Sequence, residues 1–537
     1  MCSLHLRRPT TRLVDQQTAA ENPAGSRARL WATVVSCLIG DNLAEHQDAE
    51  TSSGVSTALH LDGADPAFSS TQLRAQKLRK AFEGLGPFYI KIGQILSTRP
   101  DMVSAATTTE LSKLHDQVVA APFAGFEHVL EQELGAPWRQ YFRDIDTEPI
   151  GSASLAQVYR VTMQNGLPGV VKIQRPGIRP MVLNDMKTLR HVAKLAGRCA
   201  PRFNAVVDLD AMLHVVFNAM EAELDFTMEA QNMDEARKAL RKFKHLSVPE
   251  VVDASTRMMV QTLAPGMSIA DANRDDFSKK ERKNIGKDLL TFMYRSYFVD
   301  NYFHADPHPG NIFVHPGEKA SLIDWGMVGR IDKHVATMLI LILLSVSQND
   351  ARGTARAWIE MGHATPWADT RGFYSDLSML VPRIVSASLE ELNFGVTLST
   401  LLANSTKRGI YTQPHISLLG KSFANVEGSV RYIAPELSVI DVFEEALTDI
   451  VIDILTGFYS EKQAARIALD LMLGSEVALE HMRKLSSDLT ERDFTVRVGL
   501  LKGIQHETDS SRLGSNKLVL LTLGAAIGAL WSRRMRP

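Results

Sequence analysis

Apolar residues recur every three or four positions from about Leu73 onward. The run LRAQKLRKAFEGL has the period of an amphipathic helix, and FYIKIGQILS predicts a second helix after the breaks at Gly84, Gly86 and Pro87. Residues 335–346 (VATMLILILLSV) would extend only about 18 Å as a helix, too short for a hydrocarbon layer of roughly 30 Å. We therefore expect that segment to be a buried core helix.

The hydrophobic period changes to that of β-strands between Pro149 and Gln174. LAQVYRVTM and GVVKIQ are rich in β-formers, and Asn165-Gly166 between them is a hairpin turn signal. Helical patterns dominate afterwards, with short β-like runs at RMMVQTL, NIFVH and SLIDWG. The pattern predicts an α+β chain with a small sheet near residue 150 and a large helical body after it.

The domain organisation expected from these patterns has five parts. Basic residues gather in the first thirty positions and acidic ones in the next forty, which is typical of a poorly ordered tail. The expected parts are a tail at 1–70, a helical extension at 71–148, a small lobe with inserted helices at 149–265, a helical lobe at 266–510 and a hydrophobic segment at 511–537.

An apolar segment lies near each end of the chain. Residues 30–40 follow two arginines, as in an export signal, but no small-residue cleavage site follows cleanly, so a short amphipathic or buried segment is the better interpretation. Residues 518–531 carry no charge and hold Gly524 and Gly528 at GxxxG spacing, which indicates a membrane anchor or a homodimer contact. Three arginines beyond it favour a re-entrant, interfacial or dimer-paired helix over a simple span, and docking on the protein's own core is the alternative.

Composition narrows the class of protein. With 45% hydrophobic and 22% charged residues, the chain is neither collagenous, largely disordered nor a multi-span membrane protein. Its net charge of -2 argues against binding nucleic acid by bulk charge. Three cysteines are too few for a disulfide framework, which indicates a reducing compartment.

The densest group of chemically competent residues lies in YFHADPHPGNIFV and SLIDWGMVGR. Asp306 and Asn311 are five positions apart in a predicted loop, and Asp324 ends a predicted strand. A phosphotransferase needs one carboxylate to orient the nucleophile, and an amide with a second carboxylate to hold Mg²⁺ on nucleotide phosphates. We predict Asp306 as catalytic and Asn311 and Asp324 as metal ligands. His304 and His308 flank Asp306 at HxDxH spacing, but a transition-metal site would not explain Asn311 and Asp324.

The other half of such a site is expected on the strands. Lys172 in VVKIQ can meet phosphates and a helical carboxylate, for which Glu229 is the candidate. In an open two-lobed site we expect Glu229 to keep partial access to solvent. The preceding segment fits a nucleotide-binding loop in which alanine stands at two of the usual glycine positions. Its expected nucleotide-binding residues are Gly151, Ser152, Ala153, Ser154 and Val158.

These motifs, in this order, resemble the UbiB-type atypical kinases, the AarF-domain family, over roughly residues 73–441. LGPFYIKIGQILSTRPDM is similar to the family's KxGQ signature, PIGSASLAQVYR to its alanine-rich loop, and SLLGKSFANVEGSVRYIAPEL to its helical C-terminal region. Glu223 and Asp225 match its ExD motif. The chain departs from the family pattern at Gly151-Ser152, at Trp325 in place of Phe, and at Thr262, where the hinge usually carries a glutamate; the first departure bears on nucleotide preference.

The resemblance implies a bilobal protein-kinase-like fold whose KxGQ helices cover the place where a protein substrate would dock. Lys91 would be catalytic, reaching the pocket to contact Glu223, Asp225 or Asp324, and the ExD residues and Gln94 would assist nucleotide binding. It also implies ATP or ADP with Mg²⁺, and a role in isoprenoid quinone or lipid metabolism. The catalytic domain would be cytoplasmic at a bacterial inner membrane, or mitochondrial in a eukaryote.

Two other functions compete with an atypical kinase or ATPase. A small-molecule phosphotransferase of the aminoglycoside or choline kinase type shares the HxDxxxxN loop but should lack the KxGQ and ExD motifs. A non-catalytic module switched by nucleotide would bind lipid or partner proteins without turnover. Release of phosphate distinguishes this module from an enzyme.

Overall fold

The computed structural model describes residues 66–114, 119–199, 201–386 and 394–458, together with residues 30, 31, 33, 34, 36 and 37. The chain divides into two units, residues 1–456 and 457–537, and nearly all described residues belong to the first. Most of the expected tail, and the whole segment at 511–537 with Gly524 and Gly528, lie outside the described residues. No helix in the described part is long and apolar enough to cross a membrane.

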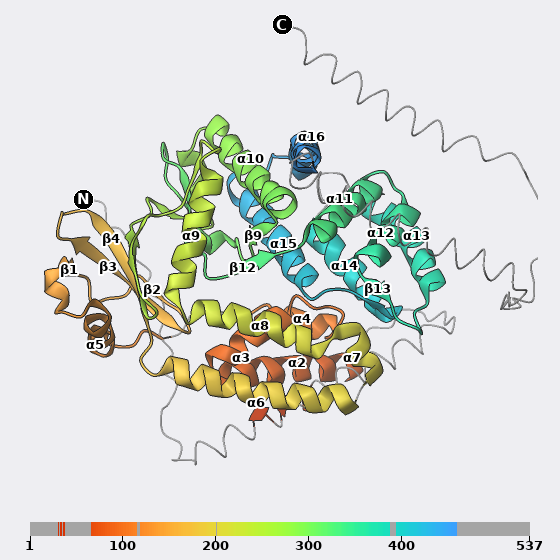
Figure 1. Ribbon diagram of the computed structural model, residues 1–537, viewed down its shortest axis with the longest axis horizontal. Helices are drawn as coiled ribbons and strands as arrows, with labels where there is room; N and C mark the ends of the chain where they lie inside the picture. The colour runs from red at the N-terminus through yellow and green to blue at the C-terminus, as the bar shows by residue number, and fades with distance from the viewer. Residues whose placement is uncertain are drawn as a thin grey trace, which may run out of the picture. The chain divides into compact units, whose positions relative to one another are not determined.

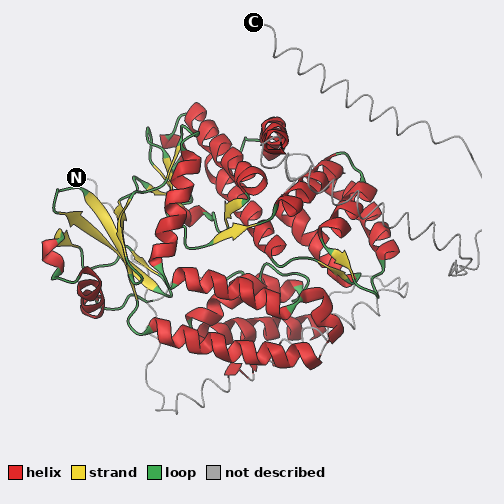
Figure 2. Cartoon of the chain, in the orientation of Figure 1, coloured by secondary structure: helices red, strands yellow, loops and turns green. Residues whose placement is uncertain are grey.

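A six-stranded antiparallel sheet forms the small lobe (Figures 1 and 2). The predicted hairpin is present: β3 pairs with β4, and Gly166 in the turn has a φ of 85°, which favours glycine. The sheet begins at Phe142, before the expected boundary at 149, because β1 pairs with β3. Its strands are β1 (Phe142–Ile145), β2 (Gly151–Ser152), β3 (Ala156–Met163), β4 (Pro168–Gln174), β6 (Val251–Ala254) and β7 (Met258–Thr262), and α5 (Phe123–Leu134) packs on β4.

The extension and the inserted helices share one hydrophobic core beside the sheet (Figure 1). A Cβ at Gly93 would lie 2.9 Å from Cδ2 of Phe82 and closer still to Leu114, so a larger residue there would force these side chains to shift. Val34 and Cys37 are buried in the same core, which confirms a buried segment at the described part of 30–40. The helices of this layer are α2 (Pro66–Leu85), α3 (Pro87–Leu96), α4 (Ala105–Leu111), α6 (Ile178–Cys199), α7 (Pro201–Val207) and α8 (Leu209–Glu223).

The helical lobe surrounds a second, larger core. Helix α11 buries Val335, Leu339 and Leu343, which confirms the predicted core helix at 335–346. The helices of this lobe are α9 (Phe226–Leu240), α10 (Lys279–Arg295), α11 (Lys333–Ser347), α12 (Ala351–Met361), α13 (Thr370–Ser386), α14 (Phe394–Lys407), α15 (His415–Ile433) and α16 (Val439–Phe458). Its short strands are β5 (Leu246–Ser247), β8 (Met267–Ser268), β9 (Tyr302–His304), β10 (Ile312–Val314), β11 (Ala320–Leu322), β12 (Val328–Arg330), β13 (His363–Ala364) and β14 (Ile410–Tyr411).

A buried ion pair within the extension is linked to the helical lobe by a hydrogen bond. Arg99 donates to both carboxylate oxygens of Asp101 at 2.7 and 2.6 Å, and both side chains are almost fully buried. Asp101 also accepts a hydrogen bond from Thr406 of α14 at 3.3 Å. This hydrogen bond joins the segment that follows α3 to α14.

Candidate functional site

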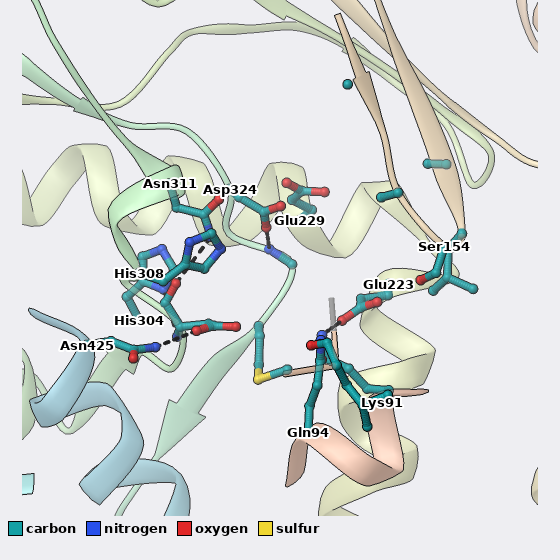
Figure 3. A pocket seen from close by; sticks show the side chains of 18 of the residues that line it. Lys91, Gln94, Ser154, Glu223, Glu229, His304, His308, Asn311, Asp324 and Asn425 are labelled. Carbon is teal, nitrogen blue, oxygen red and sulfur yellow. Dashed lines mark hydrogen bonds and ion pairs between the residues drawn. The ribbon is translucent and has the colours of Figure 1, made fainter. Parts of the chain in front are cut away.

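A cavity of about 730 Å³ lies where the sheet, the extension and the helical lobe meet. Figure 3 shows Lys91 and Gln94 on one side of it and Asn311 and Asp324 on the other. The predicted residues that line it are Lys91, Gln94, Gly151, Ser152, Ala153, Ser154, Val158, Lys172, Glu223, Glu229, Asp306, Asn311 and Asp324. Residues from six separate stretches of the chain therefore converge on one site.

Lys172 of β4 lies between two acidic side chains of the cavity. Its ammonium lies 2.7 Å from Glu229 of α9 and 3.5 Å from Asp324, which confirms the predicted pair with Glu229. Burial alone would lower the pKa of Lys172, but the carboxylates of Asp324 and Glu229 raise it above its ordinary value. Lys172 therefore keeps its charge, as a phosphate-binding lysine must.

Glu229 is more enclosed than we expected. Its side chain is only 2% exposed, so the expectation of partial solvent access is wrong. The carboxylate of Glu229 accepts from the main-chain N–H of Trp325 at 3.3 Å and from Lys172 at 2.7 Å, so it faces buried groups and not solvent. Burial raises the pKa of Glu229 more than Lys172 lowers it.

Asp324 follows strand β11 and faces the cavity, with 43% of its side chain exposed. Burial alone would raise its pKa, but Lys172 and the N–H of Gly326, which donates to Oδ1 at 3.0 Å, lower it below the ordinary value. A carboxylate that stays ionised and accessible beside a phosphate-binding lysine is suited to holding a divalent cation.

The loop after β9 presents Asp306 and Asn311. Burial lowers the pKa of His304 to about 4, so its ring is neutral, and Nδ1 accepts the main-chain N–H of Asp306 at 3.1 Å. Asn311 Nδ2 donates to the main-chain oxygen of Asp306 at 3.2 Å, which leaves the amide oxygen of Asn311 as an acceptor. The oxygens of Asn311 and Asp324 fit the hard-oxygen preference of Mg²⁺. Among the described residues, no group of three or more histidine, cysteine or acidic side chains is placed to hold a metal, so HxDxH does not form the alternative site.

Two residues that we did not predict hold the carboxylate of Asp306. Lys421 donates to Oδ2 at 2.9 Å and Asn425 donates to Oδ1 at 2.6 Å, both from α15. Burial alone would raise the pKa of Asp306, but the Lys421 ammonium lowers it below its ordinary value. The available signal was the four-residue spacing in KSFAN, which places both side chains on one face of a helix.

The loop between β2 and β3 covers another side of the cavity without needing glycine. No residue from 151 to 156 has a positive φ, and a Cβ at Gly151 would make ordinary contact with Val158 at 3.8 Å. Arg175 fixes the loop by donating to the Ala153 carbonyl at 2.9 Å and to Ser152 Oγ at 2.8 Å. The backbone there thus accommodates alanine, as the family's alanine-rich form would require.

The KxGQ residues reach the cavity from α3. Lys91 forms an ion pair with Glu223, the last residue of α8, which confirms that predicted contact. Gln94 Nε2 donates to the Leu114 carbonyl at 3.2 Å. Asp225 is not among the residues that line the cavity: its carboxylate caps α9 by accepting from the N–H of Thr227 at 3.0 Å. Its role in nucleotide binding stays a prediction.

Comparison with known proteins gives consistent results. Residues 113–358 match the ABC1 atypical kinase-like domain and residues 377–438 match the UbiB helical domain. A Clostridium pasteurianum protein, named only as an uncharacterized protein in the hydrogenase 1 5′ region, is 31% identical over 381 residues, 70% of this chain and 71% of its own. The probable protein kinase UbiB of Tolumonas auensis is 31% identical over 377 residues, 68% of this chain and 69% of its own.

Two solved structures are also similar. The Rv3197–erythromycin complex from Mycobacterium tuberculosis has 21% identity and a TM-score of 0.45, over 71% of this chain and 97% of that one. The Rio2 kinase complex with ADP, Mg²⁺ and phosphoaspartate from Chaetomium thermophilum has 12% identity and a TM-score of 0.25, over 61% and 97%. From the domain matches and the relatives at about 30% identity, the chain belongs to the UbiB family of ABC1 atypical kinase-like proteins, and it has the expected α+β kinase-like fold.

Proposed function

We propose that this protein binds ATP or ADP with Mg²⁺ in the 730 Å³ cavity and turns ATP over as an atypical kinase or ATPase. The observation that carries the proposal is that Lys172, Asp306, Asn311 and Asp324, from three separate places in the sequence, line the same cavity. Family membership supports a kinase-type enzyme.

Each residue has a distinct part in this proposal. Lys172 brings a fixed positive charge to the phosphates, and Glu229 orients it through the 2.7 Å contact. Asn311 and Asp324 would hold Mg²⁺, which neutralises charge on the phosphates when bound. Asp306 orients the hydroxyl or water that attacks the terminal phosphate.

The extension restricts what this nucleophile is. Lys91 and Glu223 close one side of the cavity with an ion pair in which the lysine side chain is 8% exposed and the carboxylate 21% exposed. Because the same extension shares a hydrophobic core with the inserted helices, a large protein acceptor would have to displace a packed layer. We infer that the acceptor is water or a small molecule. A role in isoprenoid quinone or related lipid metabolism at a membrane is supported by the family resemblance and by the apolar segment at 518–531.

Thermal unfolding with and without nucleotide tests the proposal. Mg-ATP or Mg-ADP at about 100 times its dissociation constant adds about 2.7 kcal/mol to the free energy of unfolding, and this raises Tm. We expect Asp324→Asn to lose most of that rise, and the rise itself to require magnesium. Asp253→Asn, an exposed acid on β6, is the matched control and keeps the full rise. If the rise in Tm is undiminished in Asp324→Asn, the assignment of Asp324 as a Mg²⁺ ligand is contradicted. A second assay, phosphate release in the presence of liposomes, separates an enzyme from a nucleotide-switched module.

A further inference from the structure

Helix α15 engages the Asp306 carboxylate on both of its oxygens. Lys421 and Asn425 are one turn apart, and they reach Oδ2 at 2.9 Å and Oδ1 at 2.6 Å. Both line the cavity, and the side chains of Lys421 and Asp306 are 22% and 19% exposed. In this arrangement each oxygen of Asp306 already accepts from a strong donor, and these donors compete with a nucleophile for the same carboxylate.

The backbone of α15 is fixed against the Asp306 loop. Ser422 Oγ donates to the main-chain oxygen of His304 at 2.6 Å, and Ser429 Oγ donates to that of Pro307 at 2.9 Å. Tyr297 OH lies 2.8 Å from Ser422 Oγ and adds a third buried contact. Because the backbone is held at these points, the part of Lys421 that is free to move is its flexible four-carbon stem.

Charge in the cavity favours such a movement once a nucleotide binds. Three lysines line the cavity, and each is paired with carboxylates: Lys91 with Glu223, Lys172 with Glu229 and Asp324, and Lys421 with Asp306. ATP brings about four negative charges, of which one Mg²⁺ neutralises about two. The remaining charge attracts the nearest ammonium groups. Of the three partnerships, that of Lys421 engages Asp306, the carboxylate proposed to orient the nucleophile.

We propose that Lys421 is a phosphate-binding residue that exchanges partners: it pairs with Asp306 when the terminal phosphate is absent, and it binds the terminal phosphate of bound ATP. The exchange frees Oδ2 of Asp306 for the attacking hydroxyl or water, while Asn425 keeps Oδ1 in place. This inference rests on the proposed function and deepens it, because it makes α15, in the UbiB helical domain, the sensor that distinguishes ATP from ADP.

Titration of nucleotides into the full-length protein tests the exchange. The probes are the β,γ-imido analogue of ATP and ADP, each with Mg²⁺, and isothermal titration calorimetry gives both dissociation constants. Loss of a charge-assisted hydrogen bond to phosphate weakens binding by about tenfold or more. We therefore expect Lys421→Met to lose about tenfold or more in affinity for the ATP analogue and to keep its affinity for ADP, which lacks the terminal phosphate.

Two control variants separate this role from a structural one. Lys421→Arg keeps a cation and should keep the preference for the ATP analogue over ADP. Asn425→Ala removes the other donor to Asp306 without removing a charge, and it should also keep the preference. If circular dichroism shows that Lys421→Met is not folded, Lys421→Gln replaces it under the same criteria, because the glutamine amide can still donate a hydrogen bond to Asp306.

The outcomes distinguish the two proposals. Equal loss for both nucleotides in Lys421→Met, or an equal loss of preference in Asn425→Ala, overturns the exchange alone. A wild-type protein that binds neither nucleotide overturns the proposed function and the exchange together. A selective loss in Lys421→Met, with the preference retained in both controls, supports it.

Discussion

Replacing Lys172 with methionine should destabilise the fold as well as weaken nucleotide binding. The substitution leaves Glu229, 2% exposed, as a buried carboxylate whose remaining donor is the Trp325 N–H at 3.3 Å. Breaking one side of a buried pair typically costs about 3–5 kcal/mol. Glu229 can limit that cost by taking up a proton, and from the ordinary carboxyl pKa of 4.5 this costs about 3.4 kcal/mol at pH 7. We expect Lys172→Met to lower the free energy of unfolding by about 3 kcal/mol at pH 7.

The pH dependence of this loss of unfolding free energy tests the role of Glu229 more directly than its size at pH 7. In Lys172→Met the folded-state pKa of Glu229 is raised, so the protonated form dominates at low pH and stability is lost as pH rises above the unfolded value. Protonation at pH 5 costs only about 0.7 kcal/mol, so the destabilisation should nearly vanish there. The double variant Lys172→Met/Glu229→Gln removes the titrating group and should regain most of the stability at pH 7.

Urea unfolding of wild type, Lys172→Met, Glu229→Gln and the double variant at pH 5 and pH 7 completes the cycle, with tryptophan fluorescence and circular dichroism as independent probes. A loss below about 1 kcal/mol at pH 7 would refute the argument that Glu229 depends on Lys172 for its charge. A double variant no more stable than Lys172→Met would refute it equally, because the cost would then come from packing or from the Asp324 carboxylate and not from Glu229.

Two further predictions concern a second buried acid and the end of the chain. Burial raises the pKa of Glu427 to about 8, and within the described part its Oε2 has no hydrogen-bond partner. The protonated form of Glu427 therefore contributes fully to stability below about pH 4.5, and this contribution is lost as pH rises towards 8. Glu427→Gln removes the titrating group, so this variant should keep at pH 9 the urea midpoint that wild type shows only at acidic pH. Equal pH slopes in both proteins would contradict this. Deletion of 517–537 should abolish flotation with anionic vesicles, and retention would shift attention to residues 30–40.

The local elements of this protein could be predicted from its sequence because they depend on short-range patterns. The Asn165-Gly166 turn, the hairpin around it and the apolar helix at 335–346 all follow from periodicity and turn chemistry within about a dozen residues. The pairing of Lys172 with Glu229 was also predictable, because strand and helix order in a kinase-like lobe leaves few partners for a buried lysine.

Which residues share the cavity was decided by the tertiary structure. Lys421 and Asn425 lie more than a hundred residues beyond Asp306, and only the packing of α15 against the loop brings them to its carboxylate. Asp225 is the opposite case. Its place beside Glu223 in the ExD motif predicted a position in the cavity, but its carboxylate caps the N-terminus of α9. Glu229 is buried and accepts from the main-chain N–H of Trp325, 96 residues further along the chain, which no local pattern encodes. Sequence specifies the chemistry available along the chain, but burial and partners are set by long-range packing, which determines the charge that each group carries.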